Sequence, residues 1–516
     1  MSTPARRTAS TAAGLSGPVV VAVAALLLLA APIVRGGNRF VALSGLEVLA
    51  LALLWAMALA VARRPDAIRL AGRGQRSDAR TPLADSLLPE NGAVRWVPQI
   101  DRSRLLLALS PVWLAAIQLT PLPEAVWRQL PGHGGYAQAL DALQLGGAGW
   151  RPLSLMPDAT VLSLLAGIPL AALFLLGLLA SHGAVRTLVR VIVLAAAAQA
   201  VFGLLQVGGG RALYFGAQAY GRAIGSFANP NHFASALAMA LPLAILLLRE
   251  ALARPRRGGG QRRRFGMGAN LMHTLSVTFW AVVLLFLLSA LVASASRAGI
   301  LAALVVAGLS LMLIPVPEGA RRLRWWRAAL AAGVLAVVMM AVGTEGLLSR
   351  FDGGVQQDAR WQIFAASARA AWAYFPWGSG MGTFAGVFAP FQSPTLTHFV
   401  DFAHNDYLQL AVEGGLPFLL LAGLALTLAA ASVRRLLRRL RDDPASPWAV
   451  LQASCALGLL AVLLHSLVDF NLRIPANAMV AAFLAGVLLR RSGPAVGGSV
   501  RARPRGADGM PSAAVQ

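Results

Sequence analysis

The sequence is poor in charge, and the charge it has is of one kind. Only 13% of its 516 residues are charged, the 45 basic residues include no lysine, and 21 residues are acidic. A soluble domain carries about 25% charged residues, nearly twice this share. Hydrophobic residues make up 57% of the chain. This composition excludes an ordinary soluble domain and predicts a membrane protein.

Cysteine is almost absent as well. Cys455 is the single cysteine, which excludes an intrachain disulfide and a paired-cysteine redox motif. The net charge of +24 is compatible with nucleic-acid binding, but the arginines lie in short clusters between apolar runs, as topology signals do. We therefore expect no nucleic-acid partner.

Apolar runs long enough to cross about 30 Å of hydrocarbon as helices are frequent. The sequence predicts an all-α polytopic membrane protein, a single membrane domain over residues 1–516, with about twelve transmembrane helices near 18–34, 43–62, 105–122, 159–181, 188–207, 233–249, 274–293, 299–315, 328–343, 405–432, 448–466 and 474–489.

The distribution of arginine predicts the orientation of these spans. With the N-terminus inside, 34 of the 45 arginines fall in inside segments, as expected when positive charge resists translocation. The segment 491–516 is then a cytoplasmic tail, expected to be disordered. The segment 344–404 is a large outer loop, in which residues 359–375 fit a short helix.

Polar residues collect at the outer ends of several predicted spans. In "YGRAIGSFANPNHFA" (220–234), Asn229 and Pro230 are typical of a helix start, and Asn231 and His232 follow in its first turn. Arg222 lies just before this start. A cap alone would also explain the Asn-Pro pair, and His232 is equally compatible with helix packing.

Three further segments reach the same predicted membrane face. "SASRAGIL" (294–301) is a short outer hairpin with Arg297, and "DFAHNDY" (401–407) places His404 at the start of a span. "HSLVDFNLRIP" (465–475) contributes His465, Asp469 and Arg473 at the end of another. Asp469 could simply neutralise Arg473, and each arginine alone could be an interfacial anchor.

Together these residue types suit a phosphate-bearing substrate. Arginine stays charged and its planar fork matches phosphate oxygens, and a helix N-terminus favours an anion. A histidine near a helix start, such as His404, is favoured in the neutral form that accepts a proton. A metal held by His398, Asp401, His404 and Asp406 is an alternative, but the spacing matches no strong metal signature. Gly378, Gly380 and Gly382 are interpreted as turn residues, because the lysine of a phosphate-binding loop is absent.

In combination, "GSFANPNHFASALAMALPL", "SASRAG", "DARWQIF…WGSGMGTF" and "HNDYLQLAVEGGLP" resemble the O-antigen ligase and O-antigen polymerase superfamily of the bacterial inner membrane. The resemblance covers roughly residues 220–475. It implies a metal-independent, inverting glycosyltransferase without a cofactor, multi-pass in the inner membrane, with its active site facing the periplasm. The donor it implies is a glycan on undecaprenyl diphosphate. The acceptor would be lipid A core, a growing glycan or a protein.

The resemblance also implies roles for individual residues. His404 matches the histidine that activates the acceptor hydroxyl, and Asn405 fits a hydrogen-bond partner that orients it. Arg222 and Arg297 match arginines that hold the diphosphate, and Arg360 in "DARWQ" matches a further family arginine on the donor side. Asn231, in the capped first turn, is included among the donor-binding residues. "FAHNDY" is a form shared by polymerase-like members, so the acceptor stays open.

Two other classes of function remain as alternatives. A multi-span transporter of a small anion or solute would place polar residues near the membrane midplane, where Glu47 and Arg190 are the main candidates. A structural scaffold for an envelope polysaccharide complex would leave Arg222, Arg297 and His404 without a shared purpose. The clustering at the outer face favours the enzyme.

Overall fold

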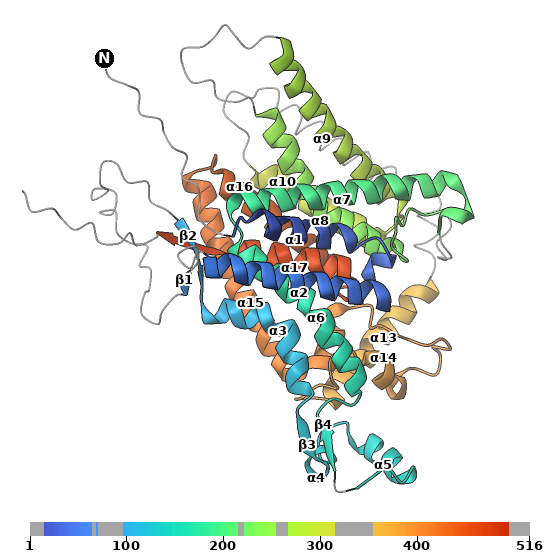
Figure 1. Ribbon diagram of the computed structural model, residues 1–516. Helices are drawn as coiled ribbons and strands as arrows, with labels where there is room; N and C mark the ends of the chain where they lie inside the picture. The colour runs from blue at the N-terminus through green and yellow to red at the C-terminus, as the bar shows by residue number, and fades with distance from the viewer. Residues whose placement is uncertain are drawn as a thin grey trace, which may run out of the picture.

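A computed structural model describes residues 15–63, 69–70, 96–147, 149–214, 221–253, 267–314 and 354–494. Over these residues the protein is a bundle of long helices with very little strand (Figure 1), which confirms the all-α membrane fold. Seven of the described helices are long and apolar enough to cross a membrane: α2 (Phe40–Arg63), α6 (Pro157–Leu179), α7 (His182–Gly209), α8 (Pro230–Leu252), α9 (Met267–Ala293), α15 (Asp406–Asp442) and α16 (Pro447–His465).

Shorter helices account for other predicted spans. They are α1 (Pro18–Ala30), α3 (Arg102–Gln118), α10 (Arg297–Leu313) and α17 (Pro475–Leu489). The predicted span 328–343 lies outside the described residues, so the total of twelve stays a prediction.

Helix α8 forms the centre of the bundle. In its most apolar stretch of 18 residues, 89% of the residues are buried. The helix packs against α7, α9, α10 and α16. A helix that is apolar on all sides is stable only when other helices surround it. The N-terminus of α8, which carries Asn231 and His232, is therefore held in place by several neighbouring helices.

Small residues allow a close crossing between α6 and α17. A Cβ atom on Gly486 would lie 2.2 Å from the carbonyl oxygen of Phe174, and one on Gly177 would lie 2.4 Å from that of Phe483. Glycine at both positions lets the two backbones touch, as is usual where membrane helices pack tightly.

The described part of the predicted loop, from residue 354 onward, is a packed substructure, as the sequence predicts for residues 359–375. It contains α13 (Gly354–Ala373), α14 (Phe384–Val387) and the short 3-10 helix η5 (Ala389–Phe391). Ile363, Phe384, Phe388 and Val400 form a small core with Val412 of α15. This core attaches the loop to the helix whose first residue is Asp406.

A second small substructure, between α3 and α6, was not anticipated. Strands β3 (Pro121–Pro123) and β4 (Trp150–Pro152) pair antiparallel and enclose α4 (Glu124–Trp127) and α5 (Gly134–Ala142), at the bottom of Figure 1. Arg128 hydrogen-bonds Glu124 at 2.6 Å and Asp141 at 2.7 Å, which ties α4 to α5.

At the opposite end of the bundle, three strands form a small sheet in the order β1, β2, β5. β2 (Trp96–Ile100) pairs in parallel with β1 (Arg69–Leu70) and antiparallel with β5 (Arg491–Pro494). The first residues of the predicted tail therefore form a strand, and residues 495–516 lie outside the described part. Three other short 3-10 helices, η1 (Arg35–Gly37), η4 (Arg211–Tyr214) and η6 (Asn471–Arg473), lie in the connections.

Candidate functional site

A buried carboxylate, Asp469, joins three segments that are far apart in the sequence. It lies between α16 and η6 and is 1% exposed. Its Oδ1 is 3.7 Å from Nε2 of His232 and 3.7 Å from Nδ1 of His404. Its Oδ2 accepts a hydrogen bond of 2.6 Å from Nδ2 of Asn231. The polar start of α8 and the segment before α15 therefore meet at one carboxylate.

The ring of Phe470 fixes the geometry of this cluster. Its edge contacts with His232 and His404 have centroid distances of 4.6 Å and 5.0 Å, and it stacks on Phe402 at 4.0 Å. The backbone N–H of Phe470 donates to Oδ1 of Asp469. Burial by itself raises the pKa of the Asp469 carboxyl, but the imidazoles of His232 and His404 bring that pKa well below its usual range.

His404 is the member of the cluster that a substrate can reach. Its side chain is 30% exposed, against 5% for His232 and 2% for Asp469. Its backbone has φ of +51°, a left-handed conformation uncommon for a residue with a Cβ and concentrated at functional sites. His404 precedes Asn405, the residue that caps α15.

The predicted start of α8 is confirmed. Oδ1 of Asn229 accepts the backbone N–H of Asn231 at 2.8 Å, and Pro230 is the first helical residue. Because the cap fixes the first turn, Asn231 and His232 are held where both contact Asp469.

The outer hairpin between α9 and α10 is fastened by Arg222. Its Nε and one terminal nitrogen donate to the carbonyl oxygens of Ser294 at 2.8 Å and Ala295 at 3.0 Å. Ser296 caps α10, and Arg297 follows as an exposed first residue. In this structure Arg222 positions the hairpin that carries Arg297, and its predicted role in donor binding stays a prediction.

Close packing brings the hairpin next to the cluster. A Cβ on Gly299 would lie 2.6 Å from Cβ of Ala234, on α8, and 3.3 Å from Cε1 of His465. His465 is buried, and neither ring nitrogen has a hydrogen-bond partner among the described residues. Arg360, half-buried on α13, lies close enough to act electrostatically on this ring. The predicted residues Arg297, Arg360 and His404 thus occupy the same end of the bundle.

Asn405 has a structural role at the beginning of α15. Its Oδ1 accepts the N–H of Leu408 at 3.0 Å, and its Nδ2 donates to the carbonyl oxygen of Leu467 at 2.9 Å. The second bond reaches the connection that contains Asp469. Asn405 therefore holds the two segments of the cluster together, and its predicted part in orienting His404 stays a prediction.

Asp406 and Glu413 also join α15 to the connection that follows α16. Buried Asp406 accepts the N–H of Leu472 at 2.9 Å. Arg473 pairs with the buried Glu413 at 2.5 Å. The alternative in which Asp469 neutralises Arg473 is wrong, because a deeper carboxylate takes that place and leaves Asp469 to the histidines.

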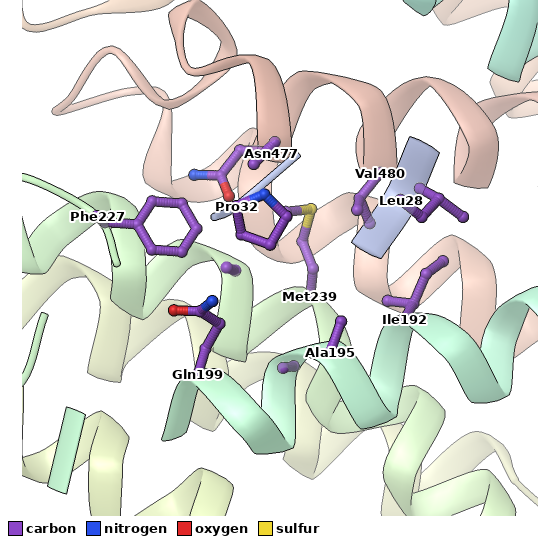
Figure 2. A pocket seen from close by; sticks show the side chains of 12 residues that line it. Leu28, Pro32, Ile192, Ala195, Gln199, Phe227, Met239, Asn477 and Val480 are labelled. Carbon is purple, nitrogen blue, oxygen red and sulfur yellow. The ribbon is translucent and has the colours of Figure 1, made fainter. Parts of the chain in front are cut away.

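A small cavity lies below the cluster, between α1, α7, α8 and α17 (Figure 2). Its walls are mostly apolar, with Met239, Phe227 and Val480 among them, and two amides, Gln199 and Asn477. Nδ2 of Asn477 donates to the backbone oxygen of His232 at 3.0 Å, so the cavity adjoins the candidate site. Within the described ranges, no group of three or more histidine, cysteine, aspartate or glutamate side chains is arranged to hold a metal ion.

Residues 282–423 match the family model described as O-antigen ligase. This match supports the superfamily resemblance that the sequence motifs carry. The matched segment contains Arg297, Arg360, His404 and Asn405, and the family is one of glycosyl-transferring membrane enzymes. No curated protein matches the chain.

The sequence placed Asp469 at the correct face but did not identify its partners. It lies outside the segment matched to the O-antigen ligases, at the end of α16. Its proximity to Arg473 in the sequence suggested an ion pair between the two. The spacing in "HSLVDFNL" carries no signal for a carboxylate that contacts α8 and the start of α15, because those contacts depend on tertiary packing.

Proposed function

We propose that the protein transfers or polymerises a glycan from an undecaprenyl-diphosphate donor to an acceptor hydroxyl at the periplasmic membrane face. The proposed reaction needs no metal and inverts the anomeric centre. The observation that supports it most directly is the pairing of a partly exposed histidine, His404, with a buried carboxylate, Asp469, at the end of the bundle that also carries Arg297.

His404 acts as the general base in this proposal. Its Nδ1 faces Asp469, which leaves Nε2 on the other side of the ring for the acceptor hydroxyl. Nε2 takes the hydroxyl proton as the oxygen attacks the anomeric carbon, and the bond from that carbon to the diphosphate oxygen breaks with its electron pair going to the leaving group. The carboxylate of Asp469 stabilises the imidazolium that forms. Attack opposite the leaving group gives inversion.

The arginines neutralise the diphosphate as it leaves. Negative charge grows on the phosphate oxygens, and fixed guanidinium groups in a partly dry site stabilise it without reorganisation. Arg297, at the exposed start of α10, and Arg360, on α13, are proposed to contact the donor directly. Arg222 contributes by holding the hairpin, and Asn231 by holding Asp469.

A membrane-face site suits a lipid-linked donor. The polyprenyl diphosphate stays in the bilayer throughout, so the reacting phosphate has to be met where lipid and water meet. The arginine distribution supports a periplasmic position for the end of the bundle with His404, because positive charge resists translocation across the inner membrane. The polar residues cluster there and not at the midplane, which favours transfer over transport of a small anion or solute.

Purified protein in nanodiscs, incubated with undecaprenyl-diphosphate glycan and candidate acceptors, tests the proposal. EDTA is present, and products are identified by mass spectrometry and their anomeric configuration by NMR. We expect His404→Ala and Arg297→Ala each to abolish transfer while expression and insertion stay normal. His398→Ala changes an exposed histidine of the same loop and serves as the control. Normal product from both site variants would refute the assignment.

The acceptor used in that assay also separates the remaining alternatives. Turnover with lipid A core indicates a ligase, turnover with a second donor glycan indicates a polymerase, and turnover with a protein indicates protein glycosylation. If the wild-type protein turns over none of them, solute flux into proteoliposomes is the measurement that tests the transporter alternative.

A further inference from the structure

Arginine side chains from three helices meet at the end of the bundle opposite the candidate site. Arg104 lies in the first turn of α3, Arg435 and Arg439 lie near the end of α15, and Arg490 and Arg491 follow α17. We call these five residues the inner arginine cluster. Figure 1 shows the end of α15 beside β2, on the far side of the bundle from α13 and α14.

The cluster holds more positive charge than its carboxylate compensates. Asp101 caps α3 and contacts the guanidinium of Arg104, and it also lies 3.7 Å from Arg491. Arg435, half-buried, is repelled by Arg104, Arg491 and Arg439, and among the described residues Asp101 is the one carboxylate that opposes this repulsion. Asp442 and Asp443 follow at the end of α15 and are exposed.

Part of the cluster is buried and incompletely hydrogen-bonded. Arg490 is 4% exposed, its guanidinium lies 5.0 Å from the centre of the Trp448 ring, and it contacts the carbonyl oxygen of Ala180. Its Nε has no acceptor within the described residues. Arg490 is thus a buried member of the cluster, and Arg435, Arg439 and Arg491 are the more exposed members that an anion can reach. Arg439 and Arg490 both lie close enough to His182 to act on it electrostatically, which links Arg490 to the arginines of α15.

Apolar side chains continue from the cluster along the outside of the bundle. Leu105 and Leu106, directly after Arg104, are 37% and 46% exposed. Val433 and Leu437, on either side of Arg435, are 37% and 45% exposed. In a membrane helix, exposed leucine and valine face acyl chains. An anion held by the arginines would thus lie next to an exposed apolar surface of the protein. This arrangement suits a lipid, which carries acyl chains, and not a soluble ion.

We propose that the inner arginine cluster binds the phosphate headgroup of an anionic phospholipid from the leaflet opposite the candidate site. Guanidinium forks suit the phosphodiester oxygens, and basic pockets between membrane helices on this side are a common form of lipid site. The bound lipid joins α3, α15 and the residues after α17, whose like charges otherwise repel one another. This proposal is independent of the proposed reaction.

Thermal unfolding of the delipidated full-length protein in detergent tests the proposal. Phosphatidylglycerol, phosphatidylcholine and inorganic phosphate are added separately at equal concentration. We expect phosphatidylglycerol to raise the apparent Tm by at least about 2 °C and the other two to leave it nearly unchanged. Native mass spectrometry of the same samples should show retained phosphatidylglycerol.

Arg435→Gln should abolish most of the shift and the retained lipid. Arg438→Gln, an exposed arginine of the same helix, is the matched control and should keep both. Equal shifts with phosphatidylcholine, or a full shift in Arg435→Gln, would overturn the proposal. A shift with inorganic phosphate alone would identify a soluble anion and overturn the lipid source. If Arg435→Gln does not fold, the comparison of the two lipids with the wild-type protein still decides.

Discussion

Replacing Asp469 by asparagine tests the centre of the candidate site. The substitution keeps the shape of a side chain that is 1% exposed but removes the negative charge facing His232 and His404. If His404 accepts the acceptor proton, it becomes positively charged in the transition state, and the asparagine no longer stabilises that charge. The variant should therefore lose turnover while keeping its fold.

The size of the loss follows from the distance. Opposite unit charges about 4 Å apart interact by about 4 kcal/mol at an effective dielectric constant of about 20, and the separation here is 3.7 Å. This is an upper limit, because the ring of His404 is 30% exposed and partly screened. Since each 1.36 kcal/mol is a factor of ten in rate, we expect a loss of about 10²–10³-fold in kcat.

The assay is turnover in nanodiscs as a function of pH, with Asp401→Asn as control. Asp401 is exposed in the segment just before His404, so its variant should keep wild-type rates. Losing the neighbouring negative charge disfavours a protonated ring, so the acid limb of the pH–rate profile should move to lower pH in Asp469→Asn. A merely structural carboxylate would not move that limb.

Two results would refute the reasoning. One is an Asp469→Asn protein that retains more than a tenth of wild-type turnover. The other is a slow variant with an unchanged pH profile and a lowered Tm, which would indicate a purely structural carboxylate.

Other perturbations address stability. Glu413→Ala leaves Arg473 without its buried partner and should cost about 3–5 kcal/mol, seen as a lower Tm in detergent; an unchanged Tm would contradict this. Gly378→Ala adds a Cβ 2.3 Å from a carbonyl oxygen, at a residue with φ of +77°, and should lower the free energy of unfolding by at least about 2 kcal/mol. Gly134→Ala is the control: its added Cβ meets no atom within 4 Å, so its stability should be unchanged or slightly higher. The pKa of Asp469 is lowered on folding, so its contribution to the free energy of unfolding is present above its ordinary pKa of about 3.9 and is lost as the pH falls further. Between pH 5 and pH 3, Tm should therefore fall more in the wild type than in Asp469→Asn. An equal fall of Tm in the two proteins would contradict this prediction.

Much of the architecture was accessible from the sequence because it depends on local rules. Apolar runs of sufficient length predict membrane helices whatever their neighbours, since the bilayer requires backbone hydrogen bonds to be made within the segment. The start of α8 at Asn229 and Pro230, the short hairpin at Arg297 and the helix within 359–375 all follow from local signals, and all are present.

Other features were not accessible because they arise between distant segments. The compact unit of β3, α4, α5 and β4 depends on the ion pairs of Arg128 and on contact with the outer loop, where a Cβ on Gly132 would meet the ring of Tyr374. The pairing of β2 with β5 joins residues from opposite parts of the chain. Neither has a strong periodic pattern in the sequence.

Hydrophobicity and charge act on each segment separately, so the amino-acid sequence was enough to predict that this protein is helical, lies in a membrane and has arginine and histidine at one face. The pairing of each carboxylate with its cation follows from the folded structure. Asp469 is four residues from Arg473 in the chain, yet it faces His232 and His404, while Arg473 reaches Glu413 on another helix. The packing of α8, α15 and α16 sets these distances, and an electrostatic interaction depends on distance in space and not on separation along the chain.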